Sequence, residues 1–178
     1  KFKYYYSQQE AMETIIYINE ICKIKSRKGL LQRFIKSNQD VVLPIHDNFG
    51  KSGIKMATGS GKTKVMALVI AWHYLNAVKE NDKEYAKDFL IVAPNVIVYD
   101  RLCTDFRNGI IFKTDPIIPK HLSIFWDLNF YTKDDFTRPE AIGNCFLTNI
   151  QQLYSKEKKE IDALEDLLGE EPDFELLE

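Results

Sequence analysis

The residues best suited to chemistry form the segment Thr58-Gly59-Ser60-Gly61-Lys62-Thr63. Its two glycines tolerate positive φ angles, so the backbone of such a turn can close on a ligand. A helix that begins at Lys62 would aim unpaired N–H groups and its dipole at one place, where they favour an anion. Lys62 adds a cation for the β- and γ-phosphates of a nucleotide, and the Thr63 hydroxyl can ligate Mg²⁺. The segment therefore predicts a loop that binds nucleotide phosphates.

Such a loop must be positioned by a strand before it and a helix after it. Residues 53–56 predict a short buried strand, and a helix is expected from about Lys62. The strict phosphate-loop pattern has glycine where Met56 stands, so the match is incomplete, although its core is intact. The alternative, a flexible Gly/Ser turn with an incidental lysine, is disfavoured by this context. The predicted helix carries an apolar stripe that suits packing on a sheet: Val65, Met66, Leu68, Val69, Trp72 and Leu75.

Length and charge indicate the size of the core and the kind of partner that this chain can have. A chain of 178 residues that is 45% hydrophobic can bury one good core. The net charge of −2 hides an asymmetry, because residues 155–178 hold ten acidic residues and three lysines. Subtracting these from 26 acidic and 24 basic residues leaves 16 acidic and 21 basic in the first 154. This surplus mildly favours a phosphate-backbone partner.

Cysteine usage and hydropathy bear on the compartment. The three cysteines, Cys22, Cys103 and Cys145, lie far apart and form neither a metal-binding spacing nor a disulfide framework. No signal peptide is visible, and no apolar run approaches the roughly 18–20 residues that a membrane span needs. We therefore expect a cytoplasmic protein with no membrane partner.

The first 37 residues carry a helical pattern. Ser7 is a candidate N-cap with Glu10 three residues later, as in a capping box. A second helical stretch, residues 30–35, is expected after a break at Gly29. The aromatic cluster at residues 4–6 suits either core packing or a stacking platform, and packing is the favoured interpretation.

Strand signals continue after the phosphate-loop helix. Residues 89–93 form an apolar run bounded by Pro94, as expected for a parallel strand buried on both faces. Asn95 is expected to open a helix that continues to about Phe106. A β-like stretch follows at residues 122–126, and a further strand is expected at residues 144–148. This order predicts an α/β fold with a mostly parallel sheet and flanking helices.

Four motifs together resemble those of superfamily 2 DEAD/DEAH-box helicases. Residues 56–63 resemble motif I, and residues 91–95 with 99–102 are similar to motif Ia. Residues 147–154, Leu-Thr-Asn-Ile-Gln-Gln-Leu-Tyr, resemble motif Ib as found in the res subunits of type III restriction enzymes. Residues 7–12 resemble the adenine-recognition motif, with Gln8 as the best match and Gln9 as the fallback. The motifs occur in family order over roughly residues 6–154.

The resemblance implies a RecA-like P-loop NTPase domain that uses ATP and Mg²⁺. Residues 1–37 would be a helical segment with the adenine motif, 38–154 the first part of motor domain 1, and 155–178 an acidic connection. Lys62 and Thr63 would act in catalysis, Thr63 would hold the metal, and Gln8 would read adenine. The loop residues that would bind the phosphates are Thr58, Gly59, Ser60, Gly61, Lys62 and Thr63.

The same resemblance implies that duplex or single-stranded DNA crosses this domain. The residues implied are Pro94, Asn95 and Arg101 from motif Ia and Thr148, Asn149 and Gln151 from motif Ib. An alternative stays open for several of them. Asn95 and Asn149 suit helix caps equally well, and Arg101 suits a solvated helix position. A DNA methyltransferase subunit and the second RecA-like domain of a longer chain are further candidate partners.

Departures from the family pattern limit the expected activity. No acidic motif II of the DExH type follows motif Ib, so we expect the sequence to end before that motif. A second motor domain and a nuclease domain are also missing from the 178 residues. The chain alone is therefore expected to bind nucleotide weakly and to hydrolyse almost none.

The leading interpretation is the ATP-binding portion of a DNA helicase or translocase, from a type III restriction enzyme res subunit or a relative. One alternative is a general superfamily 2 ATPase that remodels DNA or RNA without a nuclease. Another is a phosphate-loop kinase, which leaves the resemblance to motifs Ia and Ib unexplained. The last is a non-catalytic binding module gated by nucleotide.

Overall fold

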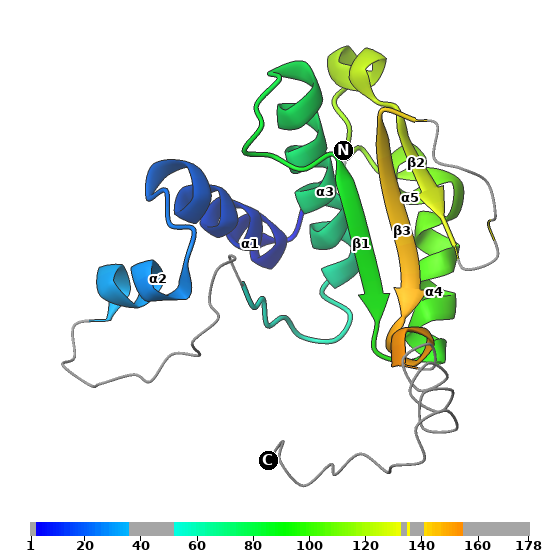
Figure 1. Cartoon of the computed structure of the whole chain (residues 1–178), viewed down its shortest axis with the longest axis horizontal. Helices are drawn as coiled ribbons and strands as arrows, with labels where there is room; N and C mark the ends of the chain where they lie inside the picture. Colours follow the sequence, from blue (N-terminus) through cyan, green and yellow to red (C-terminus); the bar gives the residue numbers. More distant parts are fainter. Residues whose placement is uncertain (1–2, 36–51, 133–134, 136–140, 155–178) are drawn as a thin grey trace, which may run out of the picture. The chain divides into compact units, whose positions relative to one another are not determined.

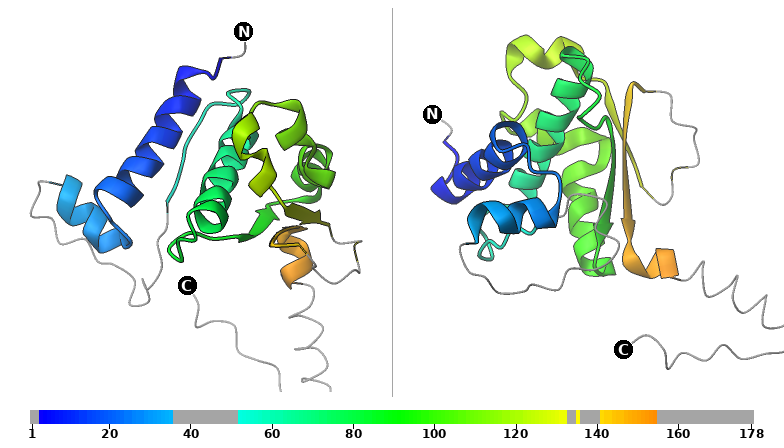
Figure 2. Two further views of the ribbon diagram at one scale, coloured as in Figure 1. Left: turned by 90° about the horizontal axis from the view of Figure 1, so that it is seen from above. Right: turned by 60° about the vertical axis from the view of Figure 1, so that its left-hand side comes forward.

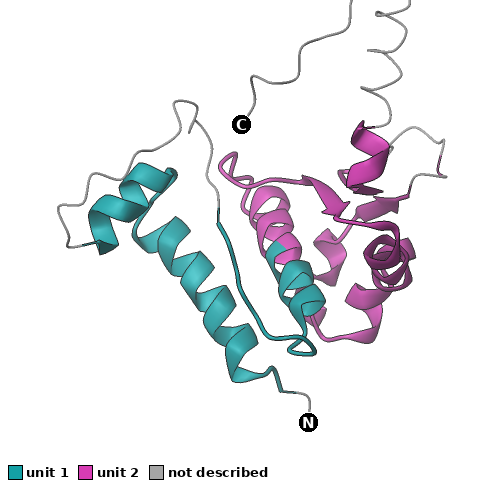
Figure 3. Ribbon diagram, turned by 90° about the horizontal axis from the view of Figure 1, so that it is seen from below, with its two compact units in different colours: residues 1–69 teal, residues 70–178 magenta. Residues whose placement is uncertain are grey.

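The computed structural model describes residues 3–35, 52–132, 135 and 141–154. Internal contacts divide the chain into two units, Lys1–Val69 and Ile70–Glu178, and the division falls within helix α3 (Lys62–Lys79) (Figure 3). The predicted acidic connection at residues 155–178 lies outside the described residues, as do residues 36–51.

The first unit contains the N-terminal helices and the glycine-rich loop. Helix α1 (Tyr6–Ile16) continues directly into a π-helical turn, η1 (Tyr17–Ile21), and α2 (Arg27–Phe34) follows (Figure 2). The predicted break at Gly29 is wrong. The Ser26 hydroxyl accepts a hydrogen bond from the Gly29 N–H at 3.1 Å, so it caps α2 and places that glycine in the first turn.

The start of α1 also differs from the prediction. Its N-cap is Tyr5 rather than Ser7, because the Tyr5 N–H donates to Gln8 Oε1 at 3.0 Å. Gln8 thus fills the third helical position of the capping box, the place given to Glu10 in the prediction. The predicted packing of the aromatic cluster is wrong for two of its members, since Tyr5 is 67% and Tyr6 is 75% exposed.

The strand expected at residues 53–56 is absent from the described part of the chain, where these residues are extended but belong to no β-ladder. A strand exists only when neighbouring chains take up its N–H and C=O groups, and an apolar sequence cannot supply that neighbour by itself. The side chain of Ile54 is accordingly 45% exposed.

Within the described residues of the second unit, three strands form a parallel sheet (Figure 1). The strands are β1 (Asp88–Ala93), β2 (Leu128–Tyr131) and β3 (Gly143–Asn149), in the order β1-β3-β2. The predicted strands at 89–93 and 144–148 are confirmed as β1 and β3. The β-like stretch at 122–126 is wrong, because residues Lys120–Phe125 form the 3₁₀ helix η3. There Leu122 and Trp126 donate to carbonyls three residues back, those of Pro119 and Ser123.

Helices cover one face of the sheet. They are α4 (Val96–Phe106), the 3₁₀ turn η2 (Arg107–Gly109) and α5 (Ile110–Thr114), and α4 confirms the helix predicted after Asn95. Tyr74 of α3, Phe106 and Cys145 are the largest fully buried side chains of this core. Within this unit the Tyr74 hydroxyl accepts a hydrogen bond from the Asp127 N–H at 3.0 Å.

The burial of β1 differs from the prediction. Ile91 and Ala93 are buried, whereas Leu90 is 61% and Val92 is 40% exposed. Alternate residues of a strand point to opposite faces, and the second face of β1 stays open to solvent. The strand is therefore buried on one face rather than on both.

Candidate nucleotide and nucleic-acid sites

The glycine-rich loop has the backbone geometry of an anion-binding turn. Gly59 has φ +79° and Gly61 has φ +82°, and helix α3 begins immediately afterwards, at Lys62. The first N–H groups of α3 used within the chain are those of Lys64 and Val65, which donate to the Gly61 carbonyl. Among the described residues no hydrogen bond engages the N–H groups of Lys62 and Thr63. These two donors are therefore available to an anion.

The side chain of Lys62 is hydrogen-bonded to the backbone of its own loop. Lys62 Nζ donates to the Ala57 carbonyl at 2.7 Å, and Ser60 Oγ donates to the same oxygen at 2.7 Å. The Lys62 side chain is exposed. A charged phosphate oxygen is a stronger acceptor than a neutral carbonyl, so an arriving phosphate can take this cation from Ala57. The role of Ala57 was missed because a backbone carbonyl leaves no signal in the sequence.

Gln8 contacts the phosphate loop directly. Its Nε2 donates to the Ser60 carbonyl at 3.0 Å, and the residue is only 3% exposed. Because its Oε1 already accepts from Tyr5, the side chain joins the start of α1 to the loop. The φ angle at Gly61 favours glycine, and a Cβ atom added there would displace the Gln8 amide that holds the loop.

The amide of Gln8 is not saturated by these contacts. A glutamine amide has two donor protons and an oxygen with two lone pairs, and each atom makes one of the hydrogen bonds just described. Counting only the described residues, one proton and one lone pair remain, which is the kind of donor and acceptor pair that matches an adenine edge.

A cleft of about 530 Å³ lies beside the loop in the same unit. One wall comes from α1 and η1, and the other comes from residues 52–57 and Ser60. The α1 wall presents Ala11 and Ile15, so part of the cleft is apolar. A cleft of this size, with apolar walls and a polar end at the loop, has room for a nucleoside.

The remaining loop residues are accessible. Thr58 and Gly59 are exposed, and Thr63 is half-buried in the first turn of α3. Within the described residues no three His, Cys, Asp or Glu side chains gather as a metal site. The Thr63 hydroxyl is an oxygen donor of the kind that Mg²⁺ prefers.

The nucleic-acid residues predicted from motifs Ia and Ib meet at one edge of the sheet. Ala93 pairs with Asn149, so β1 and β3 end at the same level (Figure 1). Pro94 and Asn95 follow β1, and Thr148 and Asn149 close β3. The carboxyl edge of an open parallel sheet is where ligands of α/β proteins bind.

Both asparagines at this edge cap helices. Asn95 Oδ1 accepts from the Val98 N–H at 2.9 Å, at the start of α4. Asn149 Oδ1 accepts from the Gln152 N–H at 2.9 Å, and Asn149 is only 4% exposed. The capping role that the sequence left open is thus their role here, and only Asn95 also faces solvent.

The other predicted contacts differ in accessibility. Thr148 Oγ1 donates to Gln152 Oε1 at 2.8 Å and is half-buried. Pro94, Arg101 and Gln151 are exposed. The surface that nucleic acid can reach at this edge is therefore formed mainly by Pro94, Asn95, Arg101 and Gln151.

The sequence was also compared with models of known protein families. A family model described as "Type III restriction enzyme, res subunit" matches residues 1–170. The chain belongs to this family. Its domain is RecA-like, and the parallel sheet with flanking helices agrees with that fold. Neither the curated proteins nor the solved structures that were searched gave a match.

Members of this family share a general function. The type III res family consists of helicase-type motor domains that act with ATP and Mg²⁺ and interact with nucleic acid. Among the described helices, none combines the length and the apolar character that crossing a membrane requires.

Proposed function

We propose that this chain is the ATP-binding portion of a DNA translocase or helicase of the type III res kind. The observation that carries the proposal is the loop at residues 57–63. It combines two positive-φ glycines, two unused N–H donors and Lys62 at the start of a helix. This combination suits a nucleotide phosphate, and one member of the family's adenine motif contacts the loop directly.

In this proposal each loop residue has a distinct role. The N–H groups of Lys62 and Thr63 bind phosphate oxygens, while Thr58, Gly59 and Gly61 shape the turn. Lys62 Nζ leaves the Ala57 carbonyl and neutralises charge on the β- and γ-phosphates, an electrostatic contribution to phosphoryl transfer. Thr63 supplies one oxygen ligand to Mg²⁺, which when bound neutralises phosphate charge.

Gln8 would connect base recognition with the shape of the loop. Its unused proton and lone pair face the edge of adenine, and its engaged proton holds Ser60. A base bound here would hold Gln8 in place and so fix the loop that carries the phosphates. This pre-organisation lowers the entropic cost of binding the second half of the nucleotide.

The nucleic-acid partner would be DNA at the carboxyl edge of β1 and β3. The exposed residues there include Pro94, Asn95, Arg101 and Gln151, so polar side chains and one cation are available for sequence-independent contact with phosphates. A motor that moves along DNA needs contacts of this kind. A second RecA-like domain and a DNA methyltransferase subunit are the further partners of the proposed enzyme.

Calorimetry with MgATP tests the nucleotide half of the proposal. We expect the wild-type chain to bind and Lys62→Ala to bind at least about tenfold more weakly, since a charge-assisted contact is lost. Lys113→Ala is the matched control, because it removes an exposed lysine of α5 far along the chain. Equal affinity in the wild type and in Lys62→Ala would contradict the proposed site.

Fluorescence anisotropy with labelled single-stranded and duplex DNA tests the other half. Binding through phosphates must weaken as salt is raised from about 50 to 200 mM, because counterions are released on binding. Arg101→Gln should weaken binding and reduce the salt dependence. DNA binding that ignores both salt and Arg101 would argue for a protein gated by nucleotide but acting on another partner.

A further inference from the structure

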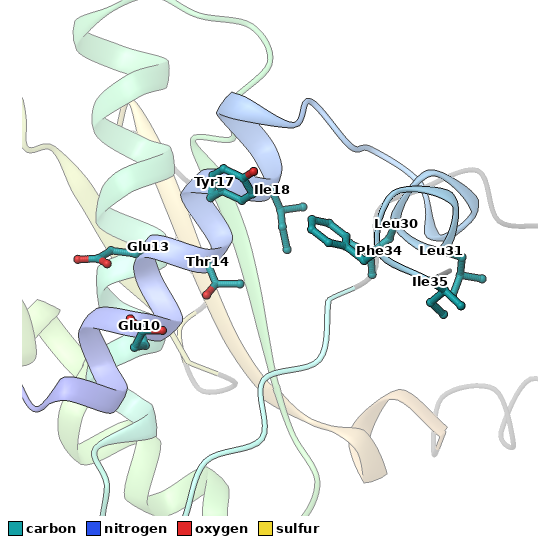
Figure 4. Close-up of a pocket in the computed structure, with 9 residues that line it drawn as sticks. All are labelled: Glu10, Glu13, Thr14, Tyr17, Ile18, Leu30, Leu31, Phe34 and Ile35. Carbon is teal, nitrogen blue, oxygen red and sulfur yellow. The ribbon is translucent and has the colours of Figure 1, made fainter. Parts of the chain in front are cut away.

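A second cavity of the first unit lies between the two N-terminal helices and has a volume of about 670 Å³ (Figure 4). Helix α1 and the π-helical turn form one side, and α2 forms the other. We call it the α1–α2 groove. Its apolar lining consists of Tyr17, Ile18, Leu30, Leu31, Phe34 and Ile35.

The apolar side chains of this groove are open to solvent. Phe34 is 52% exposed, and Tyr17 and Ile35 are each 45% exposed. Figure 4 shows Phe34 and Ile18 pointing toward one another across the groove. Clustered exposed apolar side chains with a polar border mark interaction surfaces, whereas isolated ones need no explanation.

The backbone on one side of the groove is unusual. At Tyr17–Ile21 the helix widens into a π-helical turn, in which the Cys22 N–H donates to the Tyr17 carbonyl at 2.9 Å. Single π-turns within α-helices are rare, and they occur frequently at functional sites. Here the turn contains Tyr17 and Ile18, two of the groove's own apolar residues.

The charges around the groove have one sign. Glu10 and Glu13 are the only charged side chains that line it in the part of the chain the structure describes. They are three residues apart on α1, so they lie on the same side of the helix. A ligand for this groove must therefore be apolar in the middle and basic where it meets α1.

We propose that the α1–α2 groove docks an amphipathic helix of a partner protein, with an apolar face and Lys or Arg at its edge. A helix laid between two helices buries apolar anchors at i, i+3, i+4 and i+7, which suits a groove lined on both sides. The two carboxylates select basic helices over acidic ones. No residue of the phosphate loop lines this groove, although Glu10, Thr14 and Ile18 line both the groove and the cleft beside the loop.

The test uses two synthetic amphipathic peptides of about 18 residues, long enough to form a helix. Both carry leucine at the same helical spacing, one with lysine and one with glutamate at the polar positions. We expect the full 178-residue chain to bind the Leu/Lys peptide at least about tenfold more tightly than the Leu/Glu peptide, measured by fluorescence anisotropy. Equal affinities, or no binding of either peptide, would overturn the proposal.

Variants locate the binding site on the groove. Phe34→Asp and Ile35→Asp should each weaken the Leu/Lys peptide by about tenfold, since both side chains are exposed anchors. Ile124→Asp is the control, because Ile124 is 86% exposed on η3 and does not line the groove. Circular dichroism checks that each variant is folded. If Phe34→Asp is unfolded, Ile35→Asp decides, because Ile35 lies just beyond α2.

A double variant tests the preference of the groove for basic over acidic helices. Glu10→Gln combined with Glu13→Gln should reduce the preference for lysine over glutamate to about twofold or less and remove most of its salt dependence. Sedimentation of the chain alone tests whether a second copy of this chain, rather than a partner protein, occupies the groove. A concentration-dependent dimer that Phe34→Asp abolishes would assign the groove to a second copy of this chain and would overturn the partner proposal.

Discussion

The side-chain amide of Gln8 donates to the Ser60 carbonyl over 3.0 Å, although 52 residues separate them in the chain. The same side chain accepts a hydrogen bond from Tyr5, so one buried glutamine fixes both the first turn of α1 and the second half of the phosphate loop. A displacement of Gln8 therefore changes the loop and the helix start together. The conformation of the phosphate loop therefore depends on Gln8, whose only role expected from the sequence is to bind adenine.

Gly61→Ala should damage the loop more than Gly59→Ala does. Both glycines have positive φ, +82° and +79°, so alanine is strained at either position by about 1 kcal/mol. Only at Gly61 does the added Cβ meet Gln8, whereas nothing lies within 4 Å of it at Gly59. We expect MgATP affinity, measured by calorimetry, to fall at least about tenfold further in Gly61→Ala than in Gly59→Ala.

A double-mutant cycle isolates the contact between Gly61 and Gln8. Gln8→Ala removes the atom that alanine at position 61 would strike. The loss of unfolding free energy in the combined variant should then be smaller than the sum of the two single losses by about 1 kcal/mol. Additive losses, measured by urea unfolding, would show that the strain comes from the φ angle alone.

Asn95→Asp separates helix capping from DNA contact. Aspartate accepts the Val98 N–H as well as asparagine does and suits a helix N-terminus, so stability to urea should stay within about 0.5 kcal/mol. Asn95→Ala should instead cost about 1 kcal/mol. DNA affinity, measured by anisotropy, should fall several-fold in Asn95→Asp, because the added charge repels phosphate.

Asn129→Asp is the control for the added charge. It places the same charge on an exposed position of β2, before the carboxyl edge where Asn95 lies. The Asn95 prediction fails if both aspartates weaken DNA binding equally, because the effect would then reflect the net charge of the chain.

Local signals were sufficient for much of the second unit. The apolar runs of β1 and β3 and the Asn95 cap of α4 each leave a signal within a few residues of sequence, and all three were predicted correctly. The start of α3 at Lys62 was predicted for the same reason, since glycines precede it. The two strands also needed each other as partners, and β1 and β3 pair along their full common length.

Features that depend on a distant partner were not predictable. Residues 53–56 have strand composition but no ladder in the described part of the chain, and Gln8 caps α1 because Ser60 also holds its side chain. The buried stripe of α3 was only partly predicted. Val65 is buried as expected, but the other buried positions are Ala67, Ile70, Ala71 and Tyr74, whereas Met66, Leu68, Val69, Trp72 and Leu75 are half-buried. A helix that is apolar around most of its circumference does not show in its sequence which side will be buried.

The free energy of unfolding should fall as the pH is lowered from about 7 to about 5. Burial lowers the pKa of His73 below its ordinary value of 6.5. Its buried Nδ1 has no hydrogen-bond partner among the described residues. The unfolded chain therefore takes up a proton at a higher pH than the folded chain does, and stability present above about pH 6.5 is lost below it. Urea unfolding at several pH values measures this slope.

His73→Phe should flatten that slope while keeping ring contacts to Trp72 and Tyr85, whose centroids lie 4.6 and 5.6 Å from the His73 ring. A slope that persists in His73→Phe would assign the pH dependence to carboxylates instead.

Cys145 should react with a thiol reagent only when the sheet opens. It lies in the middle of β3 at 0% exposure, and burial raises the pKa of its thiol to about 12. The thiolate is the reacting form, and almost no Cys145 thiolate is present at pH 8.

The other two thiols serve as the comparison. Cys22 and Cys103 are only half-buried and should react quickly. With a disulfide reagent at pH 8 we expect two fast thiols and one slow one, whose rate reports local opening of the sheet. Cys145→Ala should remove the slow phase alone, and three equal rates would show that the core around β3 is not closed in solution.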